Sequence, residues 1–220
     1  RDLRMSRGLG DVYKRQLFSC AEQDLPKEYT DSVNVFIGTG GHGHTFPGAT
    51  LPHGMVQLSP DTRLLGWDAC SGYYYDDTSI MGFTHTHLSG TGIGDYGDIL
   101  FMPVVGEKPL IAGTAENPDE GYRSRFSHEQ ESARPGYYQV LLQDDSINVE
   151  LTATLRAGLH RYTYPKASDA RLIVDMEPTI HGHQHPVTQI RVVNDSTIAG
   201  MKYTVGWAKH HYVYSVSYTH

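Results

Sequence analysis

Histidines at alternate positions are the residues whose type and spacing most directly suggest chemistry. The sequence has 13 histidines, and they include the pairs His42 with His44 and His85 with His87. In an extended strand, residues i and i+2 project to the same face, so such a pair could offer two imidazoles to one metal ion. A zinc site also needs a third ligand, which spacing alone does not identify. The alternative, favoured for His85 and His87, is a pair of loop histidines that bond to backbone groups.

Neighbouring acidic residues are candidates for the general acid and general base of a hydrolase. Glycoside hydrolysis uses two carboxylates, one on each side of the scissile bond. The pairs Asp76-Asp77 and Asp144-Asp145 fall at predicted turns, where aspartate is favoured because it bonds to backbone. The other neighbouring acidic residues are Asp95 and Asp98, and Asp175 and Glu177. None of these pairs is placed to face its partner across a substrate, so the sequence predicts no complete catalytic pair in this chain.

The tryptophan at position 67 is the most informative aromatic residue. It lies in the string GWDACSGY, Gly66–Tyr73, which reads as a glycine-flanked loop before a strand. An exposed tryptophan in such a loop offers an apolar face and an N–H group, and both suit stacking on a sugar ring. The alternative is a side chain that folds back onto the core. Both interpretations of Trp67 remain open from the residues alone.

Composition excludes several classes of protein. Lys plus Arg is 18 and Asp plus Glu is 25, so the net charge is −7, whereas proteins that bind nucleic acid or anionic membranes need a basic surface. A hydrophobic content of 39% is sufficient for a core. The sequence has no apolar run of about 18 residues, so no transmembrane helix is expected. Two cysteines cannot form a disulfide scaffold.

The two ends of the chain differ from its middle. Residues 1–16 are basic and resemble translated adapter sequence, and residues 215–220 look like an appendage of the same kind. Both segments are therefore expected to be non-native and are left out of the predicted fold. The alternative is a disordered basic arm and a frayed C-terminus.

A possible lipidation site lies between the first segment and the domain. Leu17–Cys20 resembles the end of a bacterial lipobox, with residues 17–28 as a lipobox remnant and polar tether. This predicts an exported protein, periplasmic or on the cell surface, that is lipidated at Cys20. A chance cysteine near a terminus is the alternative.

Short alternating runs predict strands throughout the remainder. The clearest hairpin joins Tyr137–Gln143 to Ile147–Arg156 through a turn at 144–146. Gly72–Tyr75 and Ser79–Thr84 are expected to pair with each other. The other predicted strands are Asp31–Gly38, Met55–Ser59, Asp98–Val105, Leu159–Tyr164, Arg171–Met176, Val187–Val193 and Met201–Trp207. The predicted fold is all-β, a single large antiparallel β-sandwich over residues 29–214, with further strands beyond it left open.

Several longer strings resemble the N-terminal region of glycoside hydrolase family 92. They are Phe36–Thr62, Gly66–Tyr73 (GWDACSGY), Gly82–Gly92 (GFTHTHLSGTG), Gly94–Leu100 (GDYGDIL), Ala133–Tyr138 (ARPGYY), Val149–Arg156 (VELTATLR) and Gly158–Pro165 (GLHRYTYP). They match in order and spacing, and the resemblance covers roughly residues 29–214. Only the two ends depart from the family pattern.

The resemblance implies an enzyme of which this chain is one part. The family consists of calcium-dependent, exo-acting α-mannosidases that invert anomeric configuration and release terminal mannose from glycans. It combines an N-terminal β-sandwich with an (α/α)6 domain, and the general acid, the base and the calcium ligands lie in the second domain. The chain is thus expected to pack against its own catalytic domain, to carry no catalytic or metal-binding residue, and to be inactive alone.

The resemblance also assigns roles to individual residues. Trp67 resembles the aromatic that lines the leaving-group subsite. Cys70 either borders the pocket or is a buried thiol that only packs. His53, His85 and His87 are expected to brace loops, with ligand contact by His53 and His87 as the alternative.

Two other classes of protein are alternatives to the mannosidase fragment. One is a free-standing β-sandwich that binds carbohydrate without cleaving it, and the other is a histidine-rich metal-binding β-protein. The length of the native reading frame separates the first from the enzyme, because an enzyme continues for hundreds of residues with amphipathic helices.

Overall fold

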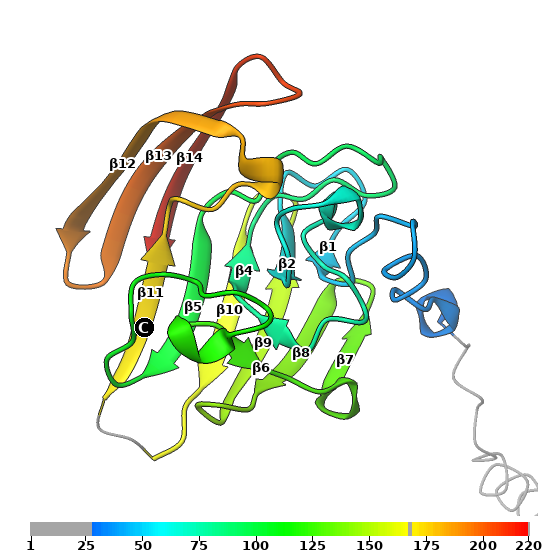
Figure 1. Cartoon of the computed structure of the whole chain (residues 1–220), viewed down its shortest axis with the longest axis horizontal. Coiled ribbons are helices and arrows are strands. Elements are labelled where there is room, and N and C mark those ends of the chain that lie inside the picture. Colours follow the sequence, from blue (N-terminus) through cyan, green and yellow to red (C-terminus); the bar gives the residue numbers. More distant parts are fainter. Residues whose placement is uncertain (1–27, 167–168, 220) are drawn as a thin grey trace, which may run out of the picture. The chain divides into compact units, whose positions relative to one another are not determined.

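The computed structural model describes residues 28–166 and 169–219, and the chain forms two compact units, Arg1–Ser32 and Val33–His220. In the first unit the described part is a single-turn 3-10 helix, η1 (Tyr29–Ser32), in which the Asp31 N–H donates to the Glu28 carbonyl. The predicted lipidation site at Cys20 and the segment 1–16 lie outside the described residues. The strands described below belong to the second unit (Figure 1).

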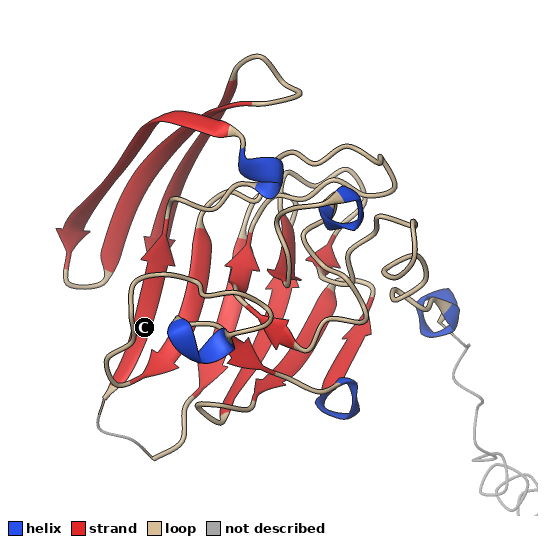
Figure 2. Cartoon of the chain, viewed as in Figure 1, coloured by secondary structure: helices blue, strands red, loops and turns tan. Residues whose placement is uncertain are grey.

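Antiparallel strands form the framework of the second unit, and loops and turns connect them (Figure 2). The five-stranded sheet has the order β1 (Ala49–Thr50), β2 (Gln57–Asp61), β4 (Gly82–Thr84), β5 (Leu100–Val105) and β11 (Ala170–Asp175). The four-stranded sheet has the order β10 (Gly158–Thr163), β9 (Ile147–Ala153), β8 (Tyr137–Leu142) and β7 (Glu131–Arg134). β3 (Ser79–Ile80) pairs with β6 (Ser124–Arg125).

A third sheet and four further 3-10 helices complete the described elements. The sheet contains β12 (Gln184–Asn194), β13 (Thr197–Val205) and β14 (His211–Tyr218). The helices are η2 (Trp67–Ala69), η3 (Pro118–Glu120), η4 (His128–Gln130) and η5 (Ile180–Gly182). In the described part of the chain no helix has the length and hydropathy needed to cross a membrane.

The main core lies between the five-stranded and four-stranded sheets. Alternate residues of β8 are buried, so one face of this strand points inward and the other toward solvent. Tyr138 and Val140 from β8 pack in one cluster with Leu58, Phe83 and Met102 from the opposite sheet. Two sheets packed face to face over such a core form a β-sandwich, as the sequence predicts.

The third sheet packs over one side of the sandwich through a smaller apolar cluster. Phe101 and Met176 of the sandwich side contact Ile198 and Val213 of β13 and β14. Residues 215–220 were predicted to lie outside the fold, and for Ser215–Tyr218 this is wrong. These residues belong to β14, with Ser215 paired to Gly200 and Tyr218 to Thr197. The non-native origin of this tail stays a prediction.

Three strand predictions can be compared directly with the structure. The hairpin at 137–156 is confirmed as β8 and β9, with Leu142 opposite Ile147. The pairing of Gly72–Tyr75 with Ser79–Thr84 is wrong, because β3 pairs with β6 and β4 with β2 and β5. The strand at Asp31–Gly38 is also wrong, because Asn34 initiates turns: its side chain accepts from the Phe36 N–H at 3.0 Å.

Candidate functional site

Loops from four parts of the sequence meet at one end of the sandwich, next to η2 and η5 in the upper part of Figure 1. The Ser71 hydroxyl donates to the Thr45 carbonyl at 2.9 Å, and the Gly90 N–H donates to the His44 carbonyl at 2.6 Å. The His181 N–H donates to the Leu64 carbonyl at 2.7 Å. These hydrogen bonds, with that between His181 Nε2 and the Gly66 carbonyl at 3.0 Å, connect the segment 64–73 and the loops around residues 44, 90 and 181.

Trp67 is presented to solvent at the start of η2. The residue is 58% exposed, and its ring packs nearly perpendicular to the His44 imidazole at a centroid distance of 4.8 Å. The loop that carries it is anchored at Gly72, where a Cβ would lie 2.1 Å from Asp61 Oδ1, so only glycine fits. The structure therefore places Trp67 where a ligand could stack on it, and not in the core.

Cys70 lies in the same loop but its side chain points inward. The residue is fully buried, and its thiol donates to the Trp67 carbonyl at 2.9 Å. Burial raises the pKa of this thiol, which keeps it protonated. In this position Cys70 supports the Trp67 turn and offers no surface to a ligand.

His85 and His87 do not converge on one point. β4 ends at Thr84, so the two side chains are not on one face of a strand. His87 Nδ1 donates to the Gln57 carbonyl at 2.7 Å, and His87 Nε2 lies 2.9 Å from Asp61 Oδ1, where neither side chain is exposed. His87 thus braces β2 and has no surface for a ligand.

His85 instead belongs to a partly buried chain of hydrogen bonds that sequence reasoning missed. Its Nδ1 donates to the Ile99 carbonyl at 3.3 Å, and its Nε2 lies 3.0 Å from His160 Nε2. The Tyr162 hydroxyl lies 2.7 Å from His160 Nδ1. Burial lowers the pKa of His85 to about 4 and that of His160 well below its usual value. Both imidazoles are therefore neutral near pH 7.

The remaining predicted site residue, His53, stands apart from this loop end. It is exposed in the turn before β2 and has a φ of 60°, in the left-handed region. The neighbouring Gly54 N–H bonds back to the Leu51 carbonyl at 3.0 Å, which closes the turn. The structure does not bring His53 together with Trp67.

Most acidic residues considered for catalysis have structural partners. Asp77 pairs with Arg63, Asp144 with Arg125, Asp145 with Lys108, Asp175 with the Tyr122 hydroxyl, and Asp95 with the Ala208 N–H. Asp98 accepts from the Thr86 hydroxyl at 2.8 Å and lies 2.9 Å from His211 Nε2. Burial opposes ionisation of Asp98, but the bonds from His211 and Thr86 outweigh it and lower the pKa of this carboxyl.

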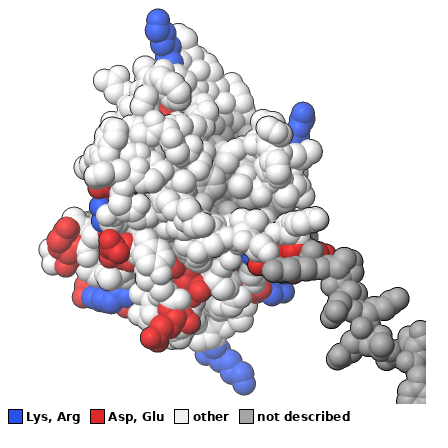
Figure 3. Space-filling model, turned by 90° about the vertical axis from the view of Figure 1, so that its right-hand side faces the viewer, with Lys and Arg blue, Asp and Glu red and all other residues white. Residues whose placement is uncertain are grey.

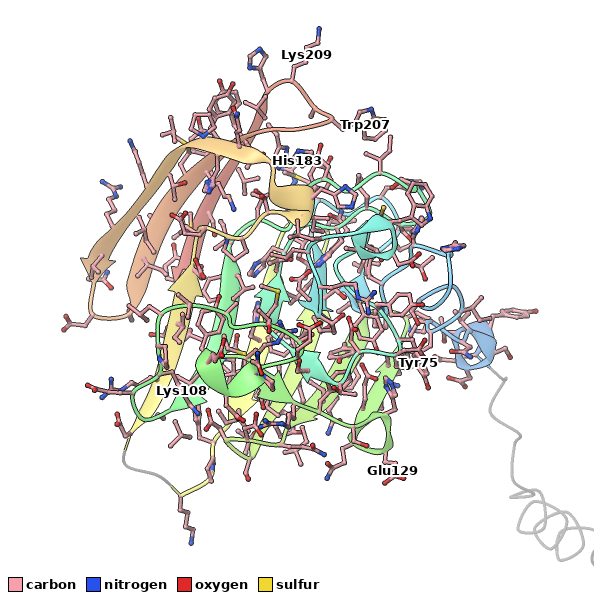
Figure 4. The ribbon with its side chains drawn as sticks, in the orientation of Figure 1. Tyr75, Lys108, Glu129, His183, Trp207 and Lys209 are labelled. Atoms are coloured by element: carbon pink, nitrogen blue, oxygen red, sulfur yellow. The ribbon has the colours of Figure 1, made fainter. Side chains whose placement is uncertain are left out.

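A second exposed tryptophan lies at the same end of the molecule. Trp207 is 61% exposed in the turn between β13 and β14, near His183 and Lys209 (Figure 4). The His183 imidazole bonds to the Gly94 carbonyl at 2.7 Å, which links this corner to the loop after Gly90. The sequence analysis took Trp207 as the end of a strand, although Gly206 before it is a turn signal. Few charged side chains lie on the upper part of the face in Figure 3.

Calcium, the cofactor that the resemblance implies, does not fit the clustered ligand atoms of this loop end. Ca²⁺ takes six to eight oxygen ligands. Within the described residues, the group that could hold a metal ion is His42, His44 and Asp68, which offers two imidazole nitrogens and one carboxylate. These residues do not form a calcium site.

Comparison with known proteins identifies the family. Residues 32–219 match the model of the glycosyl hydrolase family 92 N-terminal domain. The family GH92 α-mannosidase BT3965 from Bacteroides thetaiotaomicron is 47% identical, with a TM-score of 0.82 over 85% of this chain and 25% of that one. The family GH92 inverting mannosidase BT2199 from the same organism is 29% identical, with a TM-score of 0.63 over 81% of this chain and 23% of that one.

A curated relative agrees with this family. An uncharacterized secreted glycosidase from Arthroderma benhamiae is 32% identical over 142 residues, 60% of this chain and 17% of the relative. The chain thus spans about a quarter or less of the length of these relatives. Since the family model matches most of the described residues, the chain belongs to glycosyl hydrolase family 92 and comprises its N-terminal β-sandwich domain.

Proposed function

We propose that this chain is the N-terminal domain of an exo-acting, inverting α-mannosidase that removes terminal α-mannosides from glycans. The observation that carries the proposal is the 47% identity to an α-mannosidase over 85% of this chain. That relative has been solved in complex with mannoimidazole, so it binds a mannose-like ligand. Inversion of the anomeric configuration is proposed because the relative BT2199 is described as an inverting mannosidase.

In the proposed enzyme this domain supplies one wall of the substrate pocket. The exposed ring of Trp67, which packs against the buried His44 imidazole, is suited to contact the sugar that leaves the reaction. The buried Cys70 thiol holds the Trp67 carbonyl and so fixes the turn. Because the loop end carries few charges, an uncharged sugar suits it better than an ionic ligand.

Residues outside this chain would supply the reacting groups. A general acid would protonate the leaving oxygen and a general base would activate water on the opposite face of the ring. Calcium, held by other residues outside this chain, would help distort the mannose ring toward an oxocarbenium-like transition state. We also propose that the native protein is exported and tethered through Cys20, in keeping with the description of one relative as secreted.

The chain alone is expected to release no mannose from α-mannosides. A chimera in which residues 33–219 replace the matching region of BT3965 is expected to release it, because these 47%-identical domains share one fold. The measurement is mannose release by both proteins with and without a calcium chelator. An inactive but folded chimera would contradict the proposal that this domain forms part of the substrate pocket. Mannose release by the chain alone would contradict the proposal that the general acid and base lie outside it.

In that chimera, Trp67→Ala is expected to lower kcat/KM about ten-fold, mainly through KM, since a lost stacking contact of about 1.4 kcal/mol has that effect. Trp67→Phe retains an aromatic face and is expected to restore most of the activity. The measurement is steady-state kinetics on an α-mannoside disaccharide. Equal kinetics for the alanine variant and the parent would remove Trp67 from the pocket.

A carbohydrate-binding module without hydrolysis is the second candidate function. The observation that favours it is the pair of exposed tryptophans, Trp67 and Trp207, at one end of the fold. Sequencing the source DNA beyond the codon for Tyr214 separates the two functions, because only the enzyme continues into a long helical region. If the frame stops near His220, titration of the chain with methyl α-mannoside tests the binding module.

A further inference from the structure

Three side chains beside Trp67 converge without a full set of hydrogen-bond partners. His42 Nδ1, His44 Nε2 and an Asp68 carboxylate oxygen all lie within 4.8 Å of one another. His42 Nδ1 is 2.6 Å from Asp68 Oδ1, and His44 Nε2 is 3.5 Å from the same oxygen.

His44 gives an independent indication that a ligand is missing. The residue is only 7% exposed, and its Nε2 is buried with no hydrogen-bond partner among the described residues. A buried polar nitrogen without a partner destabilises the fold, so such atoms are rare unless an ion or a water satisfies them. This nitrogen points toward the Asp68 carboxylate, which is too distant for a good hydrogen bond.

We infer that His42, His44 and Asp68 bind a divalent transition-metal ion of the zinc type. Zn²⁺ takes imidazole nitrogen and carboxylate oxygen at about 2.0–2.2 Å, so tetrahedral ligand atoms lie about 3.4 Å apart. The separation of His44 Nε2 from Asp68 Oδ1, 3.5 Å, fits this geometry as it stands. Only His42 must move outward, and its side chain is 75% exposed and free to do so.

The chemistry of the ligands selects the metal. Two imidazoles favour Zn²⁺ and its neighbours in the transition series over Ca²⁺ and Mg²⁺, which require oxygen ligands. Three protein ligands leave a fourth position open to water. Because the His44 and Trp67 rings pack against each other nearly at right angles, the ion would fix the loop that carries Trp67. The inference depends on these residues alone and not on the proposed hydrolysis.

Metal titration of the whole chain tests the site directly. Chelator-treated protein, titrated with ZnCl₂ in a calorimeter, is expected to bind one Zn²⁺ per chain, and CaCl₂ is expected not to compete. His44→Ala and Asp68→Asn are each expected to weaken binding by about ten-fold or more, since each removes a ligand. His210→Gln is the matched control, because His210 is exposed and bonds only to Tyr203.

Fluorescence shows whether the ion lies beside Trp67. In a Trp207→Phe background Trp67 is the sole tryptophan, and Co²⁺ at the site is expected to quench it. Asp68→Asn, which keeps the shape of the side chain, is expected to abolish the quenching if His44→Ala does not fold. Zn²⁺ binding that is unaltered in both variants, or no stoichiometric binding at all, would overturn the inference.

Discussion

Asp61→Ala is expected to lower the free energy of unfolding by about 1–3 kcal/mol, the usual cost of leaving a buried hydrogen-bond donor without its acceptor. Neither Asp61 nor His87 has an exposed side chain, and His87 Nε2 lies 2.9 Å from Asp61 Oδ1. Asp61 Oδ2 also accepts from the Thr84 N–H at 3.1 Å. The alanine variant leaves the Thr84 N–H buried without this acceptor, and it removes one of two partners of His87 Nε2, the other being the Thr84 hydroxyl at 3.0 Å. Urea unfolding of the whole chain, followed by tryptophan fluorescence, measures the loss.

An exposed ion pair provides the control for this substitution. Asp169 lies 2.7 Å from Arg171, and both side chains are about half exposed. Asp169→Ala is expected to change stability by about 0–1 kcal/mol, because solvent screens such pairs. The double variant Asp61→Ala with His87→Ala should lose less than the sum of the two single losses. If Asp61→Ala and Asp169→Ala gave equal losses, the buried pair would have no special role.

The strands that sequence predicts best are those whose burial alternates on one face. β8 and β9 read as a hairpin because Tyr138, Val140 and Leu142 face the core while the residues between them face solvent. Their turn is also predictable, because aspartate is favoured in turns. In the structure, however, Asp144 and Asp145 accept from the distant Arg125 and Val105 N–H groups, which the local sequence does not reveal. In this hairpin the alternation of apolar and polar residues in the sequence matches the alternation of burial in the structure, so the prediction succeeds.

The site is less predictable because its members are distant in sequence. His42 and His44 are visible as a spaced pair, but Asp68, the third ligand of the inferred metal site, follows 26 residues after His42. His85 and His160 are 75 residues apart, and no local pattern joins them. The pair His85 and His87 fails for another reason: the strand ends before them, so the rule that i and i+2 share a face does not apply.

Acidification from pH 7 to pH 4 is expected to destabilise the fold by about 3 kcal/mol through His85 alone. Burial lowers the pKa of His85 from 6.5 to about 4, while the unfolded chain keeps the ordinary value. Between pH 6.5 and 4, His85 is therefore protonated in the unfolded state but mostly neutral in the folded state. The stabilisation is complete above pH 6.5 and is lost as the pH falls through 4. The lowered pKa of His160 acts in the same direction.

The geometry explains why neither imidazole accepts a proton in the folded state. Tyr162 donates to His160 Nδ1, His160 Nε2 donates to His85 Nε2, and His85 Nδ1 donates to the Ile99 carbonyl. Every ring nitrogen is then satisfied with both rings neutral, and a further proton on His85 Nε2 would break the central bond. Protonation must therefore open this chain of bonds, which couples it to unfolding.

The double variant His85→Gln with His160→Gln separates this effect from other titrations. Its stability, although lower at pH 7, is expected to vary little between pH 6.5 and 4. His211 does not mimic the effect, because its hydrogen bond to Asp98 raises its pKa, so its stabilisation is lost only as pH rises above 6.5. Asp98, with its lowered pKa, acts only below about 3.8. If urea midpoints at pH 7 and 4.5 coincided in the parent chain, the neutral pair would not control acid stability.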